Sequence, residues 1–187
     1  MKSGERTKER IAAAFKKLMI QGPFDGITIT DITDECGLNR LTFYYHFQDK
    51  YDLMSWIFYK EIIEPLKGNV NADNWADMLY SALKTLKDDS DFYCSSITYD
   101  RVELRTYIYD VSEEIMSDVI HDITKEVDVA EEEIEFMSKF FSHGLAGMLF
   151  DWISSGMIED PRDIVKNAVC VVDNCKLYGF AKKSQII

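Results

Sequence analysis

Hydrophobic positions recur at helical spacing along nearly the whole chain. The first segment carries one apolar face, formed by Ile11, Phe15, Leu18 and Met19. Gly22 and Pro23 then end this segment. Beyond Pro65, amphipathic patterns predict four longer helices, at roughly 74–87, 100–127, 131–155 and 161–178. The pattern therefore predicts an all-α protein.

Two short helices are predicted between these segments. The run GITIT alternates like a short strand, but Thr28 and Asp31 form a capping pair for a helix over 29–36. Asn39 is a good N-cap for the next helix, from about Arg40 to Phe47. Only the short turn around Gly37 separates the two, which is the spacing of a helix-turn-helix. A fourth helix is expected to begin near Asp49 and run to about Pro65.

The second of these short helices is unusually rich in rings. Phe43 and Phe47 are four residues apart and are expected to pack back onto Ile32 and the first helix. The remaining side chains are left for the outer surface: Arg40, Leu41, Thr42, Tyr44, Tyr45 and His46. Arginine suits bidentate contact to guanine, leucine suits a thymine methyl, and hydroxyl groups donate to phosphate oxygens. Lys50, at the start of the next helix, is expected to neutralise a phosphate.

The segment TITDITDECGLNRLTFYYHFQDKYDL resembles the signature of the TetR family of bacterial transcription regulators, and the resemblance covers about residues 5–60. Two further stretches, NRLTFYYHFQDKYDLMSWIFYKEIIEPL and FFSHGLAGMLFDWISSGM, resemble the branch labelled dihydroxyacetone kinase regulators. The resemblance implies a three-helix DNA-binding domain with a helix-turn-helix at 1–48, a connecting helix at 49–65, and a helical effector-binding and dimerisation domain at 66–187.

The same resemblance assigns the DNA contacts. The candidate DNA-binding residues are Thr28, Thr30, Asn39, Arg40, Leu41, Thr42, Tyr44, Tyr45, His46 and Lys50. Two positions depart from the family pattern. Leu41 replaces a residue that is often small or polar, which leaves the operator sequence open. Cys36 replaces the usual alanine, a change between two small buried residues.

Charge is distributed unevenly along the 187 residues. The net charge is −12, but nine Lys and Arg face eight Asp and Glu up to Lys60, so that the remainder carries about −13. This asymmetry fits a DNA-binding module whose acidic partner domain faces away from the phosphates, whereas a merely solvated acidic surface would explain only the remainder. No stretch approaches the roughly 18 to 20 apolar residues of a membrane span, and no signal peptide is visible, so a cytoplasmic protein is expected.

Other chemistries have weak signals. The four cysteines form no C-x-x-C pair, and no metalloprotease, nucleophile-elbow or phosphate-loop motif is present, so we expect neither an enzyme nor a cofactor. One helical ridge carries Asp110, Glu114, Asp118 and His121. Carboxylates and an imidazole can hold a divalent cation, but such ridges are usually solvated, and no metal is expected.

The C-terminal domain is expected to bind an effector, either a small molecule or a protein. Candidate pocket residues are Tyr93, Tyr107, Met116, His121 and His143. Rings and soft side chains of this kind line small-molecule pockets, but they also fill ordinary cores, and both interpretations stay open at this point.

The last two helices are expected to form a homodimer interface through Phe141, Leu145, Gly147, Met148, Trp152, Ala168 and Val172. Glycine destabilises a helix interior, so Gly144 and Gly147 indicate a close approach of another helix. The alternative is that both helices merely close a monomer's core. A homodimer predicts a palindromic operator.

These patterns together predict a DNA-binding transcription regulator. The resemblance implies repression as its usual mode, under control of an effector. The alternative is a helical protein-interaction adaptor, or a partner-dependent co-activator, without operator binding of its own.

Overall fold

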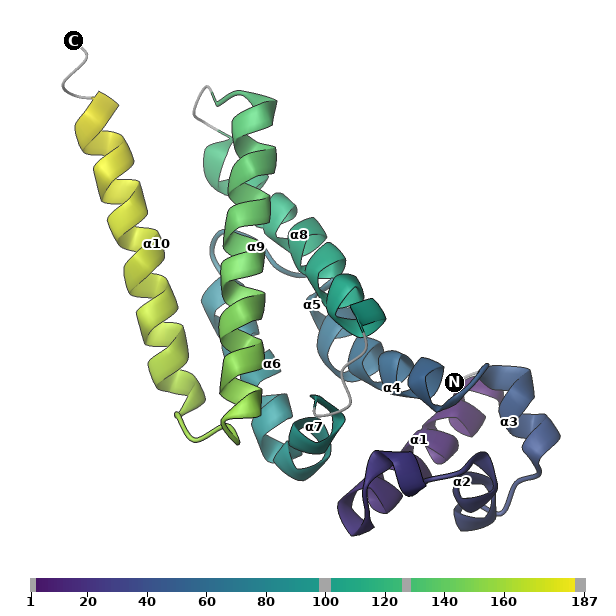
Figure 1. The fold of residues 1–187 in the computed structure, drawn as a ribbon. Helices are drawn as coiled ribbons and strands as arrows, with labels where there is room; N and C mark the ends of the chain where they lie inside the picture. The colour runs from purple at the N-terminus through teal and green to yellow at the C-terminus, as the bar shows by residue number, and fades with distance from the viewer. Residues whose placement is uncertain (1–2, 98–101, 126–128, 184–187) are drawn as a thin grey trace.

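A computed structural model describes residues 3–97, 102–125 and 129–183, and every regular element in these ranges is a helix. Figure 1 shows a small cluster of short helices at the N-terminus joined to a set of longer helices. The all-α prediction is confirmed. We call residues 3–48 the head and residues 66–183 the body.

The head contains three helices and a short turn: α1 (Ser3–Gln21), η1 (Phe24–Gly26), α2 (Ile29–Glu35) and α3 (Arg40–His46). Their boundaries lie within a residue or two of the predicted ones. Ile11, Phe15 and Ile32 are fully buried, and so is Phe43 of α3. Phe47 follows α3 and is also buried, so both phenylalanines anchor α3 to the head as predicted.

The connecting helix is interrupted. It comprises α4 (Lys50–Phe58), a π-helical turn η2 (Tyr59–Ile63) and α5 (Glu64–Leu66). Pro65 has no N–H to donate to the carbonyl of Glu61, and its ring crowds that carbonyl. The chain adjusts one residue earlier, where the Glu64 N–H bonds the Tyr59 carbonyl, five residues back. The sequence analysis predicted the length of this helix but not its π-helical turn.

The described residues of the body form five helices: α6 (Trp75–Asp88), α7 (Ser90–Ile97), α8 (Val102–Thr124), α9 (Glu131–Ser154) and α10 (Pro161–Lys183). The α8 and α9 helices pack along each other, while α10 packs mainly on α6 and extends along the outer side of the body (Figure 1). The sequence analysis did not predict α7, whose eight residues are too few to show a clear periodic pattern.

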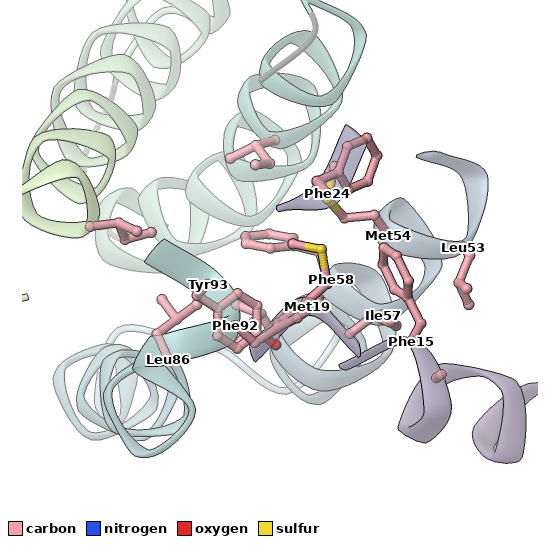
Figure 2. Packing of buried hydrophobic residues seen from close by; sticks show 14 of the residues in the cluster. Phe15, Met19, Phe24, Leu53, Met54, Ile57, Phe58, Leu86, Phe92 and Tyr93 are labelled. Carbon is pink, nitrogen blue, oxygen red and sulfur yellow. The ribbon is translucent and has the colours of Figure 1, made fainter. Parts of the chain in front are cut away.

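One hydrophobic core runs through both parts (Figure 2). Phe15 of α1 meets Phe92 of α7 edge to face, with ring centroids 6.2 Å apart. Phe58 of α4 meets Tyr93 of α7 in the same way, at 6.3 Å. The head therefore packs directly on the body, and α7 forms much of the contact.

Candidate nucleic-acid interface

A tight turn sets α3 against α2. Gly37 has a φ of 61°, a left-handed conformation that residues with a Cβ rarely adopt. Its N–H bonds the Asp34 carbonyl at 3.1 Å, and the Leu38 N–H bonds the Thr33 carbonyl at 2.8 Å. This pair of bonds is a Schellman motif, which ends α2 and redirects the chain into α3 within two residues.

The N-terminus of α2 is closed by a reciprocal cap. The Asp31 N–H donates to the Thr28 hydroxyl oxygen at 3.2 Å, while the Thr28 N–H and hydroxyl donate to the Asp31 carboxylate at 2.8 and 2.7 Å. These hydrogen bonds hold the pKa of Asp31 below its usual value. The predicted capping pair is confirmed. The Thr28 hydroxyl donates its hydrogen to Asp31. It therefore has no hydrogen left to donate to a phosphate oxygen.

The N-terminus of α3 is capped by Asn39. Its side-chain oxygen accepts from the Thr42 N–H at 2.8 Å and from the Thr42 hydroxyl at 3.0 Å. This cap confirms the predicted start of the helix. It also directs the Thr42 hydroxyl hydrogen at Asn39, whereas a hydrogen bond from that group to a phosphate was predicted from the sequence.

The outer face of α3 presents an unusual set of side chains to solvent. Leu41 and Tyr45 are 81% and 84% exposed, and Tyr44 is 49% exposed. The Arg40 guanidinium is exposed and lies 6.0 Å from the centre of the Tyr44 ring, a cation–π contact that orders both side chains. Large apolar groups on a surface mark interaction sites when they are contiguous. His46 is half-buried, and Thr30 on α2 is exposed.

Lys50 lies at the start of α4, as predicted, and its side chain has contacts within the head. Its ammonium donates to the carbonyl oxygens of Phe24 and Ile27 at 2.7 and 3.0 Å, and it lies 4.2 Å from the centre of the Phe24 ring. Partial burial lowers its pKa. The Lys50 ammonium therefore contacts the η1 turn, which precedes α2, and these contacts stabilise the structure of the head.

Other cations in and near the head are also engaged. Lys16 and Lys17 of α1 form ion pairs, and so does Lys60 of the connecting helix. Lys8 lies over the rings of Phe47 and Trp56. Within the described part of the head, four cations form no ion pair and no carbonyl contact of this kind: Lys8, Arg6, Arg10 and Arg40. The positive charge of the described head that has no acidic partner therefore lies on these four side chains.

The candidate effector residues do not form one cluster. Tyr93 is buried in the core and donates to the Glu61 carboxylate at 2.6 Å. The side chain of Tyr107 lies outside the described residues. His121 and His143 are exposed. His121 lies 3.2 Å from Glu131, and His143 stacks on Tyr109 with ring centroids 4.6 Å apart.

These two histidines are far apart along the body. Glu131 and His143 both lie on α9, where twelve residues span about 18 Å. Met116 is half-buried on α8. On the acidic ridge of α8, Glu114 forms an ion pair with Lys67 at 3.0 Å. In the ranges that the structure covers, no three His, Cys, Asp or Glu side chains gather closely enough to hold a metal ion.

The expected dimer residues divide into covered and open ones. Trp152 is buried, with its indole N–H donating to the Glu159 carbonyl at 3.0 Å, and Ala168 is buried as well. Both side chains are covered by the chain itself, so little of either is left for an intermolecular face. Phe141, Leu145, Gly147 and Val172 are half-buried, and Met148 is exposed. The open apolar face of α9 includes the predicted Gly147 and Met148, but its exposed rings are Phe136 and Phe140 in place of Phe141.

That open face forms one ridge of α9. It consists of Phe136, Phe140, Gly144, Gly147 and Met148. Phe136 and Phe140 are 71% and 65% exposed and stack on each other with centroids 6.3 Å apart. A Cβ added at Gly144 or Gly147 would meet no atom within 4 Å. We call these five residues the α9 ridge.

A capped short helix, a left-handed glycine turn and a second short helix with an exposed arginine and tyrosines define a helix-turn-helix DNA-binding head. Its helical body follows in the same chain. Residues 11–55 match the family of bacterial regulatory proteins named after tetR, and residues 73–174 match the C-terminal region of a family of transcriptional regulators. The chain belongs to the TetR family of transcriptional regulators, and it is a regulator and not an enzyme.

Individual relatives agree with this assignment. The dhaKLM operon transcriptional activator DhaS of Lactococcus lactis subsp. lactis (strain IL1403) is 30% identical over 135 residues, 72% of either chain. The uncharacterised HTH-type regulator YerO of Bacillus subtilis (strain 168) is 28% identical over 121 residues, which cover 57% of this chain and 42% of YerO. The predicted resemblance to the dihydroxyacetone kinase branch is confirmed by DhaS.

Solved structures show the same fold. The dihydroxyacetone kinase operon activator DhaS superposes with a TM-score of 0.76 at 25% identity, covering 91% of this chain and 97% of that one. NalD of Pseudomonas aeruginosa, described as the secondary repressor of a multidrug efflux pump, has a TM-score of 0.54 at 15% identity and covers 89% and 93%. NalD supports the fold alone. No helix in the described ranges is both long and apolar enough to cross a membrane.

Proposed function

We propose that this regulator binds a palindromic DNA operator as a homodimer and that an effector in the C-terminal domain controls the binding. The observation that carries the proposal is the outer face of α3, where Arg40, Leu41 and Tyr45 are exposed beside each other on a helix anchored by two buried phenylalanines. A rigid helix with an exposed arginine near its N-terminus suits the major groove of B-DNA.

The contacts divide into two classes. Arg40 is the candidate for bidentate recognition of guanine, and Leu41 the candidate for a thymine methyl. Tyr44, Tyr45 and His46 are candidates for phosphate contact beside them. Thr28, Thr30, Asn39 and Thr42 lie at the two helix N-termini, where backbone N–H groups attract phosphate oxygens. In this proposal Thr28, Asn39 and Thr42 act mainly by holding those termini in place.

The proposed dimer closes on the α9 ridge. Phe136, Phe140 and Met148 expose large apolar area, and the two glycines between them leave room for a partner backbone. A second copy of the same chain fits this surface, because the ridge runs along one long helix and can pack against its own symmetry mate. Phe141, Leu145 and Val172 border it as half-buried residues.

The effector proposal concerns the C-terminal domain as a unit. The described contacts of Tyr93, His121 and His143 lie on different neighbours, so they do not outline one pocket. An effector, whether a small molecule or a protein, acts by favouring one of two conformations that space the recognition helices differently.

The regulator acts either as a repressor or as an activator. Repression is the usual mode in the family, while the DhaS relative is named as an activator. A reporter gene placed behind the operator separates the two. Loss of the regulator raises reporter expression under repression and lowers it under activation.

Sequencing the DNA that the purified full-length protein retains from fragmented genomic DNA tests the proposal most directly. We expect enrichment of one palindromic site, confirmed by a band shift with that site and not with a scrambled one. Enrichment of no sequence, together with no band shift, would reject operator binding and favour the adaptor alternative.

A further inference from the structure

One polar cluster joins the head to the body at the edge of their shared core, where the Glu61 and Asp89 side chains are 33% and 34% exposed. The Lys16 ammonium of α1 donates to both carboxylate oxygens of Glu61, at 2.9 and 2.8 Å, and also contacts the Asp89 carboxylate. The Tyr93 hydroxyl of α7 donates to the same Glu61 carboxylate at 2.6 Å. Three segments of the chain thus meet at one carboxylate, and we call these four residues the Glu61 joint.

The surroundings of the joint are largely apolar. The Lys16 side chain is only 18% exposed, and its ammonium lies 5.0 and 5.5 Å from the ring centres of Phe92 and Tyr93. Tyr93 is 1% exposed, and burial raises its pKa, which keeps the phenol protonated and able to donate. Leaving a polar or charged group without a partner in such apolar surroundings costs free energy.

Glu61 lies within the π-helical turn. Residues 59–63 form the turn that accommodates Pro65, and Glu61 is its central residue. A π-helical turn holds one residue more than an α-helical turn, which rotates the following side chains by about 100° relative to a regular helix. Such turns occur mostly as isolated irregularities in helices and often at functional sites.

The apolar contacts around the joint cannot set its geometry by themselves. Hydrophobic contact is non-directional, so Phe15 and Phe92 keep much of their stabilisation when α1 slides or rotates on α7. Hydrogen bonds, in contrast, weaken steeply when distance or angle changes. The polar cluster is therefore the part of the contact that selects one orientation of the head.

We propose that the Glu61 joint sets the angle between the DNA-binding head and the body, and thereby positions the recognition helix α3 for DNA. The inference rests on the proposed dimeric operator binding, because only a dimer needs two heads at a defined spacing. A conformational change in the body then reaches the head through Tyr93 and Asp89 on one side of Glu61 and through Lys16 on the other.

Two substitutions test the joint in the full-length protein. Tyr93→Phe removes one hydroxyl and keeps the buried ring, and Glu61→Gln removes the shared charge. The matched control is Glu35→Gln, which breaks the Lys17–Glu35 pair inside the head. The Glu35 and Glu61 side chains are similarly exposed, at 30% and 33%, so the same chemical change is made in comparable surroundings.

The first measurement is the ratio of two dissociation constants, one for a single half-site and one for the full operator. A loosened joint lowers the effective concentration of the second head, so we expect this ratio to fall by about tenfold in both joint variants. We expect Glu35→Gln to keep the wild-type ratio, whatever it does to each constant. Wild-type ratios in both joint variants would overturn the proposal.

The second measurement does not depend on DNA. Amide hydrogen exchange in α1 and α7 is expected to be faster in both joint variants than in the wild type, and unchanged in α7 of Glu35→Gln. If the wild type itself binds half-site and full operator equally, the proposed dimeric operator binding fails. Amide hydrogen exchange then tests the proposed role of the Glu61 joint independently of DNA binding. Wild-type exchange rates in both joint variants would reject that role.

Discussion

Among single side chains, Arg40 has the most clearly expected role in DNA binding. It is exposed at the start of α3, ordered by the Tyr44 ring and engaged in no ion pair among the described residues. Replacing Arg40 with alanine is expected to cost about 1 to 3 kcal/mol of binding and to relax specificity at one base pair. Dissociation constants for the operator and for each single-base variant check this. Equal losses on operator and random DNA would show that Arg40 contacts only phosphate.

Lys50 is expected to act through the head's own structure. Because its ammonium bonds two carbonyls of the η1 segment, Lys50→Met should lower the free energy of unfolding by about 1 kcal/mol. Urea denaturation measures this change. The dependence of operator binding on salt should stay at its wild-type slope. A slope reduced by about 1, with unchanged stability, would restore the phosphate contact predicted from the sequence.

We expect His121 to make the stability of the body depend on pH. Its Nδ1–H donates to the Ser117 carbonyl at 2.8 Å, and its Nε2 faces Glu131, which together raise its pKa above the ordinary value of 6.5. A folded-state pKa above the unfolded one stabilises the protein fully below about 6.5, and this contribution is lost as pH rises through the folded pKa.

Comparison with His121→Gln measures this contribution. The wild type should exceed the variant in unfolding free energy near pH 6, and the difference should shrink steadily toward pH 8. Glu131→Gln should reduce the same pH dependence while keeping the imidazole. A difference that does not vary with pH would show that the pKa of His121 is the same in the folded and unfolded states.

Among the helices, α9 performs two tasks on different faces. One face holds Ile134, Ala146 and Phe150 in the core, while the α9 ridge remains open. Since a Cβ added at Gly147 would meet no atom within 4 Å, Gly147→Leu should leave the monomer intact or stabilise it by roughly 0.5 to 1 kcal/mol through better helix propensity. In a dimer closed on this ridge, the same leucine should weaken association.

Sedimentation equilibrium and urea denaturation separate the two effects. Glu135→Leu is the control, because it adds the same side chain to an exposed position on another face of α9. We expect Gly147→Leu to raise the dimer dissociation constant and the control to keep it. A dimer equally stable in both variants would place the interface elsewhere.

For the assembled regulator, the geometry of the operator follows from the dimer. Two recognition helices related by a two-fold axis read half-sites about 34 Å apart, one DNA turn, or at a larger separation that matches successive major grooves. Inserting about 5 base pairs between the half-sites turns them to opposite faces of the duplex. Affinity should then fall to that of a half-site and recover on inserting a full turn, as a band-shift series would show.

Local patterns in the sequence predicted much of this structure. The caps at Thr28 and Asn39, the turn at Gly37 and the buried phenylalanines of α3 all depend on residues within a few positions of one another. Such short-range interactions produce a recognisable spacing of residue types in the sequence. The exposed position of Arg40, Leu41 and Tyr45 followed from the same spacing, because the buried residues left only that face for solvent.

Other features depended on which distant segment covers a given side chain. Lys50 turns to carbonyls 23 and 26 residues away, and Trp152 is covered by its own chain while Phe140 is left open. Periodicity identifies an apolar face but not the segment that covers it, so it found Gly147 and Met148 of the α9 ridge but missed the exposed Phe136 and Phe140.

The sequence by itself determined that this protein is an all-α regulator with a helix-turn-helix head, since capping, turn and periodicity are local and add up along the chain. Only the tertiary structure decided how head and body are joined. Lys16, Glu61 and Tyr93 are up to 77 residues apart and carry no shared spacing. Their convergence on one carboxylate arises from the packing of three helices around a common core.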